Sequence, residues 1–246
     1  IKKIELDDIE LIYDVFYHPK NMFLIVTGNV NPYEIEQLVN DNLEQKEFKE
    51  YLNPKILPVK EPKYVVQKEV EIFANVEVEK AKIGLKIPKK EFQGLDDIKL
   101  NIILNLILSN NFGESSDLKE ELLQNGIITF LSASRFVLDD YVMIDVTIES
   151  KILDEAVKRI VNALEHLVMS EEDLKRKIHS SIATLVLNYE DVENVNNMIQ
   201  NYLVYYHEII PNLKEIYESI TLEEVNEVMA AISTKEMTIV TMKKQK

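Results

Sequence analysis

Hydrophobic and polar positions recur with two different periods along this chain, and the two periods separate helices from strands. Apolar residues at positions 9, 12, 13 and 16 follow helical spacing, and an acidic pair stands in the first turn of the predicted helix, residues 6–17. A continuous apolar run over residues 22–26 predicts a strand that is covered on both faces in the middle of a sheet. Pro32 suits the first position of a second helix, which we expect to end near Leu43.

Beyond residue 64 the pattern predicts strands first and helices afterwards. Positions 142, 144, 146 and 148 are apolar and alternate with Met143, Asp145 and Thr147, as in a strand with one buried face. The predicted strands are residues 64–73, 80–87, 127–136 and 141–148, and the predicted helices are residues 96–108, 116–126, 153–169, 171–190 and 192–206. Hairpin strands followed by gathered helices predict an α+β fold, with an antiparallel sheet and helices packed on one face.

The end of the chain repeats the pattern of its beginning. Residues 4–28 and residues 220–242 each contain an isoleucine, a leucine two positions later, an acidic pair, apolar residues at helical spacing, a short polar turn and an apolar run. Met22 aligns with Met237 in this comparison. A match at such a separation indicates two copies of one structural unit, although helix–turn–strand units are common enough to converge on this pattern. If the repeat is real, the chain begins near the end of the first copy and is a fragment.

The stretch between the predicted units has the composition of a connector. From residue 45 to residue 62 charged residues dominate, and Pro54, Pro58 and Pro62 recur at four-residue spacing. Prolines at this density favour an extended segment. We therefore expect three parts: residues 1–47, a linker over residues 48–64, and a complete domain over residues 65–246.

Composition excludes several classes of function. The chain has 246 residues, of which 46% are hydrophobic and 29% are charged, as in an ordinary globular protein. Its formal net charge of −15 argues against nucleic acid, which requires a basic face. An acidic surface could steer basic peptides toward the protein, but it is also a common means of solubility. No apolar run approaches the roughly 18 residues of a membrane span. The absence of cysteine excludes disulfides and thiolate metal sites, and it is compatible with the cytoplasmic location that we expect.

The residues that usually carry hydrolytic chemistry are not arranged for it here. Two histidines on one helical turn with a glutamate would bind zinc, but neither His-Glu-x-x-His nor His-x-x-Glu-His occurs. The four histidines, which are His18, His166, His179 and His207, are predicted to be structural or exposed. Ser115 and Ser116 have no histidine nearby in the sequence and are predicted to cap a helix. We expect no catalytic residue and no metal ligand in this chain.

Residues 18–35, HPKNMFLIVTGNVNPYEI, resemble the segment that closes the first half of insulinase/pitrilysin-family zinc metallopeptidases. The matching positions, which we expect to be structural, are Tyr17, Pro19, Asn21, Met22, Gly28, Asn29 and Pro32. Three further stretches fall where the family places them: residues 113–128, with Gly113, Ser115, Ser116 and Gly126, residues 169–177 and residues 219–229. The resemblance covers nearly the whole chain and is greatest to bacterial members of the mitochondrial-processing-peptidase-like branch.

The resemblance implies a zinc metallopeptidase as the parent chain and a peptide as its substrate. Residues 1–47 would be the helix–strand–helix end of a first metallopeptidase-like domain, and residues 65–246 would be the second, non-catalytic domain. Zinc and the glutamate that activates water would both lie in the absent N-terminal half, so no cofactor is expected in this chain. The present half would form the opposite wall of the substrate chamber and would be inactive alone.

One departure from the family pattern bears on partners. Second halves in this family often carry an arginine and a tyrosine that help to bind the peptide at the zinc. The corresponding positions here, within one residue, hold Leu122 and Thr129. Arg135 and Tyr141 could imitate that pair, although strand residues that point to solvent are the simpler interpretation. The departure implies a heterodimer in which a homologous partner subunit supplies the pair. The alternative is a non-catalytic core or scaffold protein of the same fold that acts through protein–protein contacts.

Overall fold

The computed structural model describes residues 3–55, 57 and 61–245, and their contacts divide the chain into two compact units. Unit 1 comprises Ile1–Glu61 and Leu187–Ile210, and unit 2 comprises Pro62–Val186 and Pro211–Lys246. One segment of unit 1 therefore comes from late in the sequence. Among the described residues, none of the helices combines the length and apolar character that a membrane crossing requires.

Unit 2 is built on a five-stranded sheet with the strand order β1-β5-β2-β4-β3. The strands are β1 (Glu69–Ala74), β2 (Glu79–Pro88), β3 (Phe130–Val137), β4 (Tyr141–Ser150) and β5 (Met237–Lys244). Neighbouring strands are antiparallel except for β1 and β5, which are parallel. The predicted α+β class is confirmed. The sheet, which was expected to be antiparallel, is mixed because the last strand of the chain lies between the first two and runs parallel to β1.

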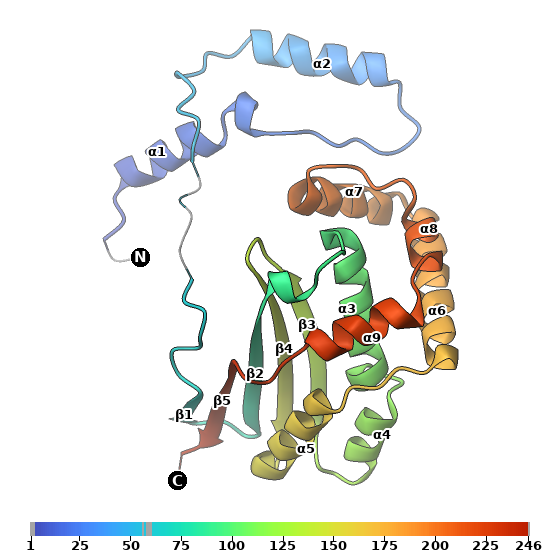
Figure 1. Ribbon diagram of the computed structural model, residues 1–246. Helices are drawn as coiled ribbons and strands as arrows, with labels where there is room; N and C mark the ends of the chain where they lie inside the picture. Colours follow the sequence, from blue (N-terminus) through green and yellow to red (C-terminus); the bar gives the residue numbers. More distant parts are fainter. Residues whose placement is uncertain (1–2, 56, 58–60, 246) are drawn as a thin grey trace. The chain divides into compact units, whose positions relative to one another are not determined.

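The core of unit 2 lies on one face of this sheet. The alternating residues of β2 and β4, among them Ile83, Leu85, Ile144 and Val146, have no solvent exposure and stand opposite one another in register. The helices α3 (Asp97–Phe112), α4 (Asp117–Gln124), α5 (Leu153–Glu165) and α9 (Leu222–Ala231) lie to one side of the strands, as Figure 1 shows. α3 buries apolar residues around most of its circumference. A helix that is apolar on all sides is typical of a protein interior.

β5 and the helix before it form the second copy of the sequence repeat. Thr221 and Glu224 close a capping box at the start of α9, with the Thr221 backbone N–H donating to Glu224 Oε2 over 3.0 Å. β5 then pairs with β1 on one side and with β2 on the other. Consecutive pairing of β1 and β2, which their closeness in sequence suggests, does not occur because β5 occupies the position between them.

Unit 1 contains the first copy of the repeat. Its helices are α1 (Leu6–Phe16), α2 (Pro32–Glu44) and α7 (Val192–Tyr206), with the short 3-10 helix η1 (Pro19–Asn21) after α1. All three α-helices were predicted within two residues of these bounds. α1 also begins with a capping box, in which the Glu5 backbone N–H donates to Asp8 Oδ2 over 3.0 Å. The acidic pairs of the two copies therefore have the same structural position.

The strand predicted over residues 22–26 is wrong for this structure. The segment is not a β-strand, and apart from the half-buried Ile25 its apolar side chains are exposed rather than covered on both faces, with Met22 at 56% and Leu24 at 66%. The reason is the lack of a neighbour, because the described residues of unit 1 contain no strand with which this segment can pair. A strand satisfies its backbone only through another strand, whereas a helix satisfies its own.

The remaining helices, α6 (Glu171–Tyr189) and α8 (Leu213–Glu218), flank α7 in the sequence. Ser170 caps α6, because its hydroxyl accepts from the Asp173 backbone N–H over 3.0 Å. The apolar stripe predicted for α1 exists, but its members Ile9, Ile12, Tyr13 and Phe16 are more than half exposed. In the described part of unit 1, the apolar face of the amphipathic helix α1 is therefore left exposed.

Candidate functional site

The loop between α3 and α4 contains Gly113, the first residue of the stretch 113–128 that resembles the metallopeptidase family. The backbone geometry of this loop explains why position 113 is a glycine. A Cβ atom at Gly113 would stand 2.3 Å from the Ser109 carbonyl oxygen, closer than any side chain can approach. Ser116 caps α4 by accepting from the Lys119 backbone N–H, as predicted. Beyond α4, Gly126 adopts a φ of 67°, in the left-handed region that glycine occupies without cost.

A buried lysine on α4 connects this loop to the edge of the sheet. Lys119 is only 5% exposed, and its Nζ donates to Glu114 Oε1 over 2.6 Å and to the Leu131 carbonyl over 2.8 Å. Leu131 lies on β3, the edge strand, so Lys119 satisfies a carbonyl that has no strand partner on that side. Sequence reasoning missed this residue because a single lysine in a polar helix gives no sign that it is buried.

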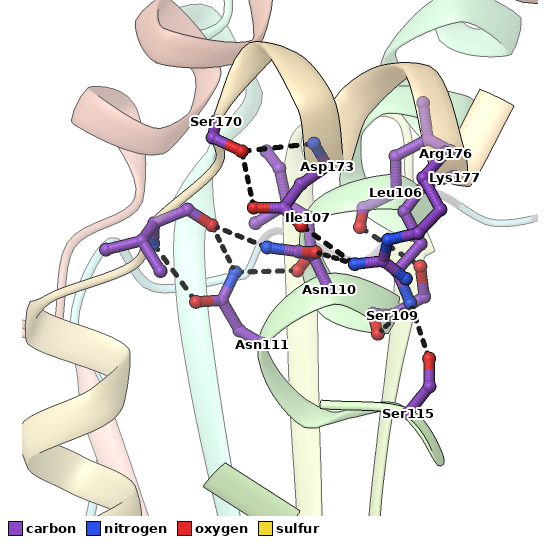
Figure 2. Close-up of polar contacts among 11 residues, drawn as sticks. Leu106, Ile107, Ser109, Asn110, Asn111, Ser115, Ser170, Asp173, Arg176 and Lys177 are labelled. Carbon is purple, nitrogen blue, oxygen red and sulfur yellow. Dashed lines mark hydrogen bonds and ion pairs between the residues drawn. The ribbon is translucent and has the colours of Figure 1, made fainter. Parts of the chain in front are cut away.

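A second lysine, on α6, fixes the other side of the same loop. Lys177 Nζ donates to the Ser109 carbonyl over 2.8 Å and to Ser115 Oγ over 3.3 Å, as Figure 2 shows. Burial lowers the pKa of Lys177, and the neighbouring Arg176 guanidinium lowers it further. The ammonium acts as a donor in both bonds and so has no lone pair with which to activate Ser115. The arrangement therefore positions the loop and is not a nucleophile–base pair.

Asparagine side chains join the end of α3 to the segment before α6. Asn111 donates from Nδ2 to the Val168 carbonyl, and its Oδ1 accepts from the Val168 backbone N–H, each over 3.0 Å. Asn110 Nδ2 also donates to the Val168 carbonyl (Figure 2). An amide side chain presents the same donor and acceptor as a peptide group, so Asn111 pairs with Val168 as a strand residue would.

The first turn of α6 carries the charged part of the cluster in Figure 2. Asp173 Oδ2 accepts from the Ser170 hydroxyl over 2.6 Å, and Asp173 Oδ1 accepts from an Arg176 guanidinium N–H over 2.8 Å. The hydrogen bond from Ser170, followed by that from Arg176, lowers the pKa of Asp173. Each contact stabilises the ionised carboxylate at the start of the helix, where the dipole also favours it.

The two positions at which the family often carries arginine and tyrosine are structural here. Leu122 is fully buried, and its carbonyl accepts from the Ile127 backbone N–H over 2.9 Å. Its neighbour Leu123 is 42% exposed, so the outward position of this turn is also a leucine. Thr129 donates to the Glu149 carbonyl from its backbone N–H over 2.8 Å and from its hydroxyl over 3.3 Å. Neither position offers a cation or a phenol to a peptide.

Arg135 and Tyr141 do not replace that pair, and neither points simply to solvent as expected. Arg135 stands opposite Ile144 in the buried row of β4, and its Nε donates to the Asn101 carbonyl of α3. Tyr141 belongs to the other row of β4 and is 9% exposed, with Lys86 Nζ 4.4 Å from the centre of its ring. The two side chains therefore leave the sheet on opposite faces, because side chains alternate along a strand.

The motif residues near the N-terminus stabilise turns. Tyr17 stacks on Tyr13 with ring centroids 5.0 Å apart, and Asn21 Nδ2 donates to the Phe16 carbonyl over 3.0 Å. Pro19 and Pro32 each occupy the start of a helix, η1 and α2. Gly28, with a φ of 135°, has a conformation that a side chain would strain. Among these residues only Met22 lies in the exposed apolar run.

The histidines are dispersed over both units. His18 caps η1 by accepting from the Lys20 backbone N–H, His166 ends α5, His179 lies within α6, and His207 ends α7. In the described part of the chain, no group of three or more histidine, aspartate and glutamate side chains could hold a metal ion.

Comparison with known proteins identifies this architecture. Residues 3–181 match the family described as "Peptidase M16 inactive domain". The uncharacterized zinc protease YmfH of Bacillus subtilis is 28% identical over 234 residues, which cover 93% of this chain and 54% of that protein. The zinc protease PqqE of Helicobacter pylori is 23% identical over 215 residues, covering 83% of this chain and 47% of that protein. This chain thus spans about half the length of the curated relatives that it matches.

A solved structure supports the same assignment at the level of the fold. An M16-like peptidase from Alicyclobacillus acidocaldarius superposes with a TM-score of 0.84 at 19% identity, covering 99% of this chain and 59% of that one. The family match extends over most of the chain and includes the α3–α4 loop, α4 and β3 described above. The chain therefore belongs to the M16 peptidase family and carries its inactive domain.

Proposed function

We propose that this chain is the non-metal-binding half of a zinc-dependent peptidase and forms the wall of the substrate chamber opposite the catalytic half. The match of residues 3–181 to the inactive domain of the M16 family carries this proposal. Two relatives named as zinc proteases are about twice as long as this chain, which leaves room for a second half. Zinc and the residue that activates water would belong to that half.

The division of the chain into domains is part of the proposal. Residues 1–47 would end the first metallopeptidase-like domain, residues 48–64 would link it, and residues 65–246 would form the second. The repeated capping boxes of α1 and α9 support two copies of one unit. A hollow of about 850 Å³ in unit 1 is lined by aromatic and apolar side chains, including Tyr13, Phe23 and Phe48. Such a surface is typical of a core that is completed by further chain.

We also propose that the peptidase is a heterodimer and that it is cytoplasmic. Leu122 and Thr129 supply neither the arginine nor the tyrosine that would orient a peptide at the zinc. In two-subunit members of this family the metal motif and that pair are divided between chains, so a chain without the pair suits the metal-bearing role. A companion of the same fold would then supply the cation that stabilises the reacting carbonyl. The lack of cysteine is compatible with a reducing cytoplasm.

The decisive experiment uses the parent chain with and without its nearest-encoded homologous companion. Both preparations are assayed against mixed peptides with zinc present, and a chelated sample of each serves as the control. We expect cleavage in the mixture alone, and we expect the chelator to abolish it. Full activity of the lone parent chain would contradict the division of labour. No activity in either preparation would favour the alternative, a non-catalytic core or scaffold protein of the same fold.

The present chain by itself offers a matched test. Residues 1–246 should bind no stoichiometric zinc by calorimetry and should cleave no peptide, because their histidines lie on separate elements. Tight zinc binding that is abolished by His166→Ala or His207→Ala would overturn the assignment of zinc to the other half. The same variants in the parent chain should leave its peptidase activity unchanged.

A further inference from the structure

The five-stranded sheet of unit 2 has a second face, opposite to the one on which α3, α4, α5 and α9 lie. Lys243 marks the helix side, because its Nζ lies 3.1 Å from Asp154 Oδ1 of α5. Side chains alternate along a strand, so Lys244 and the other members of its row point away from these helices. We call this surface the open face. It consists of the even positions of β1, β2, β3 and β5 and the odd positions of β4.

Lysines form a column along the middle of the open face. β2 is the central strand of the sheet, and its lysines on this face are Lys80, Lys82 and Lys86. Lys244 adds a fourth, so that within the five strands the open face has four lysines and two carboxylates, those of Asp145 and Glu149. The whole chain has the opposite balance, with 28 basic and 43 acidic residues. The open face is therefore a positively charged region of an acidic protein.

Two lysines of the column are accessible to a ligand. Lys86 is engaged by its own chain, because its Nζ donates to the Pro62 carbonyl over 2.7 Å. Lys80 Nζ lies 2.6 Å from Glu149 Oε1 and Lys82 Nζ lies 2.9 Å from Asp145 Oδ2, yet the two lysine side chains are 49% and 58% exposed. Ion pairs that water reaches to this extent contribute little to stability. A carboxylate of another molecule can therefore take the place of either partner.

An apolar strip borders the two accessible lysines. Val70 pairs with Val240 in this strip, and Ile72 pairs with Met242. On the β2 side, Val240 stands opposite one of the lysines and Met242 opposite the other. Ile72 is 42% exposed, and the other three side chains are half-buried. Neighbouring strands lie about 4.8 Å apart, so each lysine has an apolar side chain in the next row. This combination suits a ligand that carries both carboxylates and apolar groups.

We propose that the open face binds an extended, acidic polypeptide segment, whose carboxylates pair with Lys80 and Lys82 and whose apolar side chains lie on the strip formed by β1 and β5. The two lysines stand two residues apart on one strand, at about 7 Å. An extended peptide repeats its side chains at the same distance, so acidic residues at positions i and i+2 reach both lysines. The apolar strip and the net charge of −15 favour a peptide over a nucleic acid. The binding stands by itself, and only the role of the segment as a substrate rests on the proposed function.

Fluorescence anisotropy with the 246-residue chain tests the proposal. One dye-labelled peptide contains Glu-Ser-Glu flanked by valine and leucine, and its counterparts have Gln or Lys in place of each Glu. At low salt the Glu peptide should bind about tenfold more tightly than the Gln peptide, and added salt should remove the difference. Lys80→Glu combined with Lys82→Glu should abolish the preference for the Glu peptide and create one for the Lys peptide.

The matched control is Lys175→Glu combined with Lys214→Glu. It changes the net charge equally and alters two lysines that also form exposed ion pairs, in α6 and α8. This control should keep the affinity for the Glu peptide within about twofold. If thermal unfolding shows that the reversal of Lys80 and Lys82 destabilises the sheet, Lys80→Gln combined with Lys82→Gln decides, and it should weaken binding about threefold or more.

Two results would overturn the proposal. One is equal affinity of the parent chain for the Glu and Gln peptides, and the other is an equal loss of binding in the Lys175 and Lys214 control. The assay needs neither zinc nor cleavage, so a failure of the peptidase assay would leave its result unchanged. Conversely, a chain that binds no acidic peptide could still serve as the non-catalytic half of an active peptidase.

Discussion

The two copies of the helix–turn–strand repeat have nearly the same local sequence pattern and different structures. In unit 2, α9 leads into β5, which pairs with β1 and β2. In unit 1, α1 leads into residues 22–26, which are extended and carry exposed apolar side chains. The helices of the two copies even share the capping box, with an acidic residue at the same position in each.

The structural difference between the two copies shows which part of the repeat pattern forms from its own local sequence alone. A capped helix satisfies its backbone within its own sequence, so both copies form it. A strand needs at least one neighbouring strand, and among the described residues only the second copy has one. The repeat therefore behaves as one structural unit that is complete in one place and lacks its sheet in the other.

The largest expected effect is the loss of folding when the first part is isolated. Residues 65–246 expressed alone should unfold cooperatively on heating and give dispersed amide NMR signals, because they contain the whole five-stranded sheet. Residues 1–47 should give neither, because two amphipathic helices without a sheet cannot cover their apolar side chains. A cooperative melt from residues 1–47 would break the comparison.

The second-largest difference should come from placing a charged side chain in each unit and comparing the loss of stability. Ile144→Asp should lower the free energy of unfolding by about 3 kcal/mol or more, because Ile144 is fully buried and the carboxylate would be unpaired. Leu24→Asp is the matched control, and it should change stability by less than about 0.5 kcal/mol because Leu24 is 66% exposed. Urea denaturation of both variants measures the difference. Equal losses would show that residues 22–26 are already part of a core.

A proline substitution at the aligned position of each copy tests whether the backbone there is paired with a neighbouring strand. Ile239→Pro removes an N–H that donates to the Lys68 carbonyl over 2.8 Å, and it should cost about 2 kcal/mol because β5 has neighbours on both sides. Leu24→Pro alters the aligned position of the first copy and should cost less than about 0.5 kcal/mol, since no strand pairs there. The comparison would fail if Leu24→Pro cost as much as Ile239→Pro in thermal unfolding.

Helices and the hairpin were predictable from the sequence because their signals are local. Ser116, Pro32 and the alternation from Val142 to Ile148 each specify one element directly. The insertion of β5 between β1 and β2 could not be predicted, because it depends on pairing across about 160 residues. At the candidate site, Gly113, Gly126 and the capping residue Ser116 were identifiable from the sequence. Lys119 and Lys177 were not, because the burial of an amine depends on carbonyls brought by other elements.

The smallest expected effect compares the caps of two helices, one in each unit. Asp173 stabilises α6 as a carboxylate, and its pKa is below the unfolded value of about 3.9 because of Ser170 and Arg176. A lowered folded-state pKa gives a contribution that is fully present above about pH 4 and is lost as the pH falls through the folded pKa. Asp173→Asn should therefore destabilise the chain at pH 7, by less than about 1 kcal/mol because water reaches both side chains, with Arg176 50% and Asp173 35% exposed.

The contribution of Asp173 should then disappear on acidification, so that the unfolding curves of Asp173→Asn and the parent chain converge once the pH falls below the lowered folded-state pKa of Asp173. Asp8→Asn is the matched variant, because Asp8 takes the same capping position in α1 without an arginine beside it. The global unfolding of unit 2 should not report the loss of a cap in α1, so Asp8→Asn should leave the main transition in place at both pH values. A larger effect from Asp8→Asn than from Asp173→Asn would mean that α1 belongs to the cooperative core. The two copies of the repeat would then be coupled within this chain.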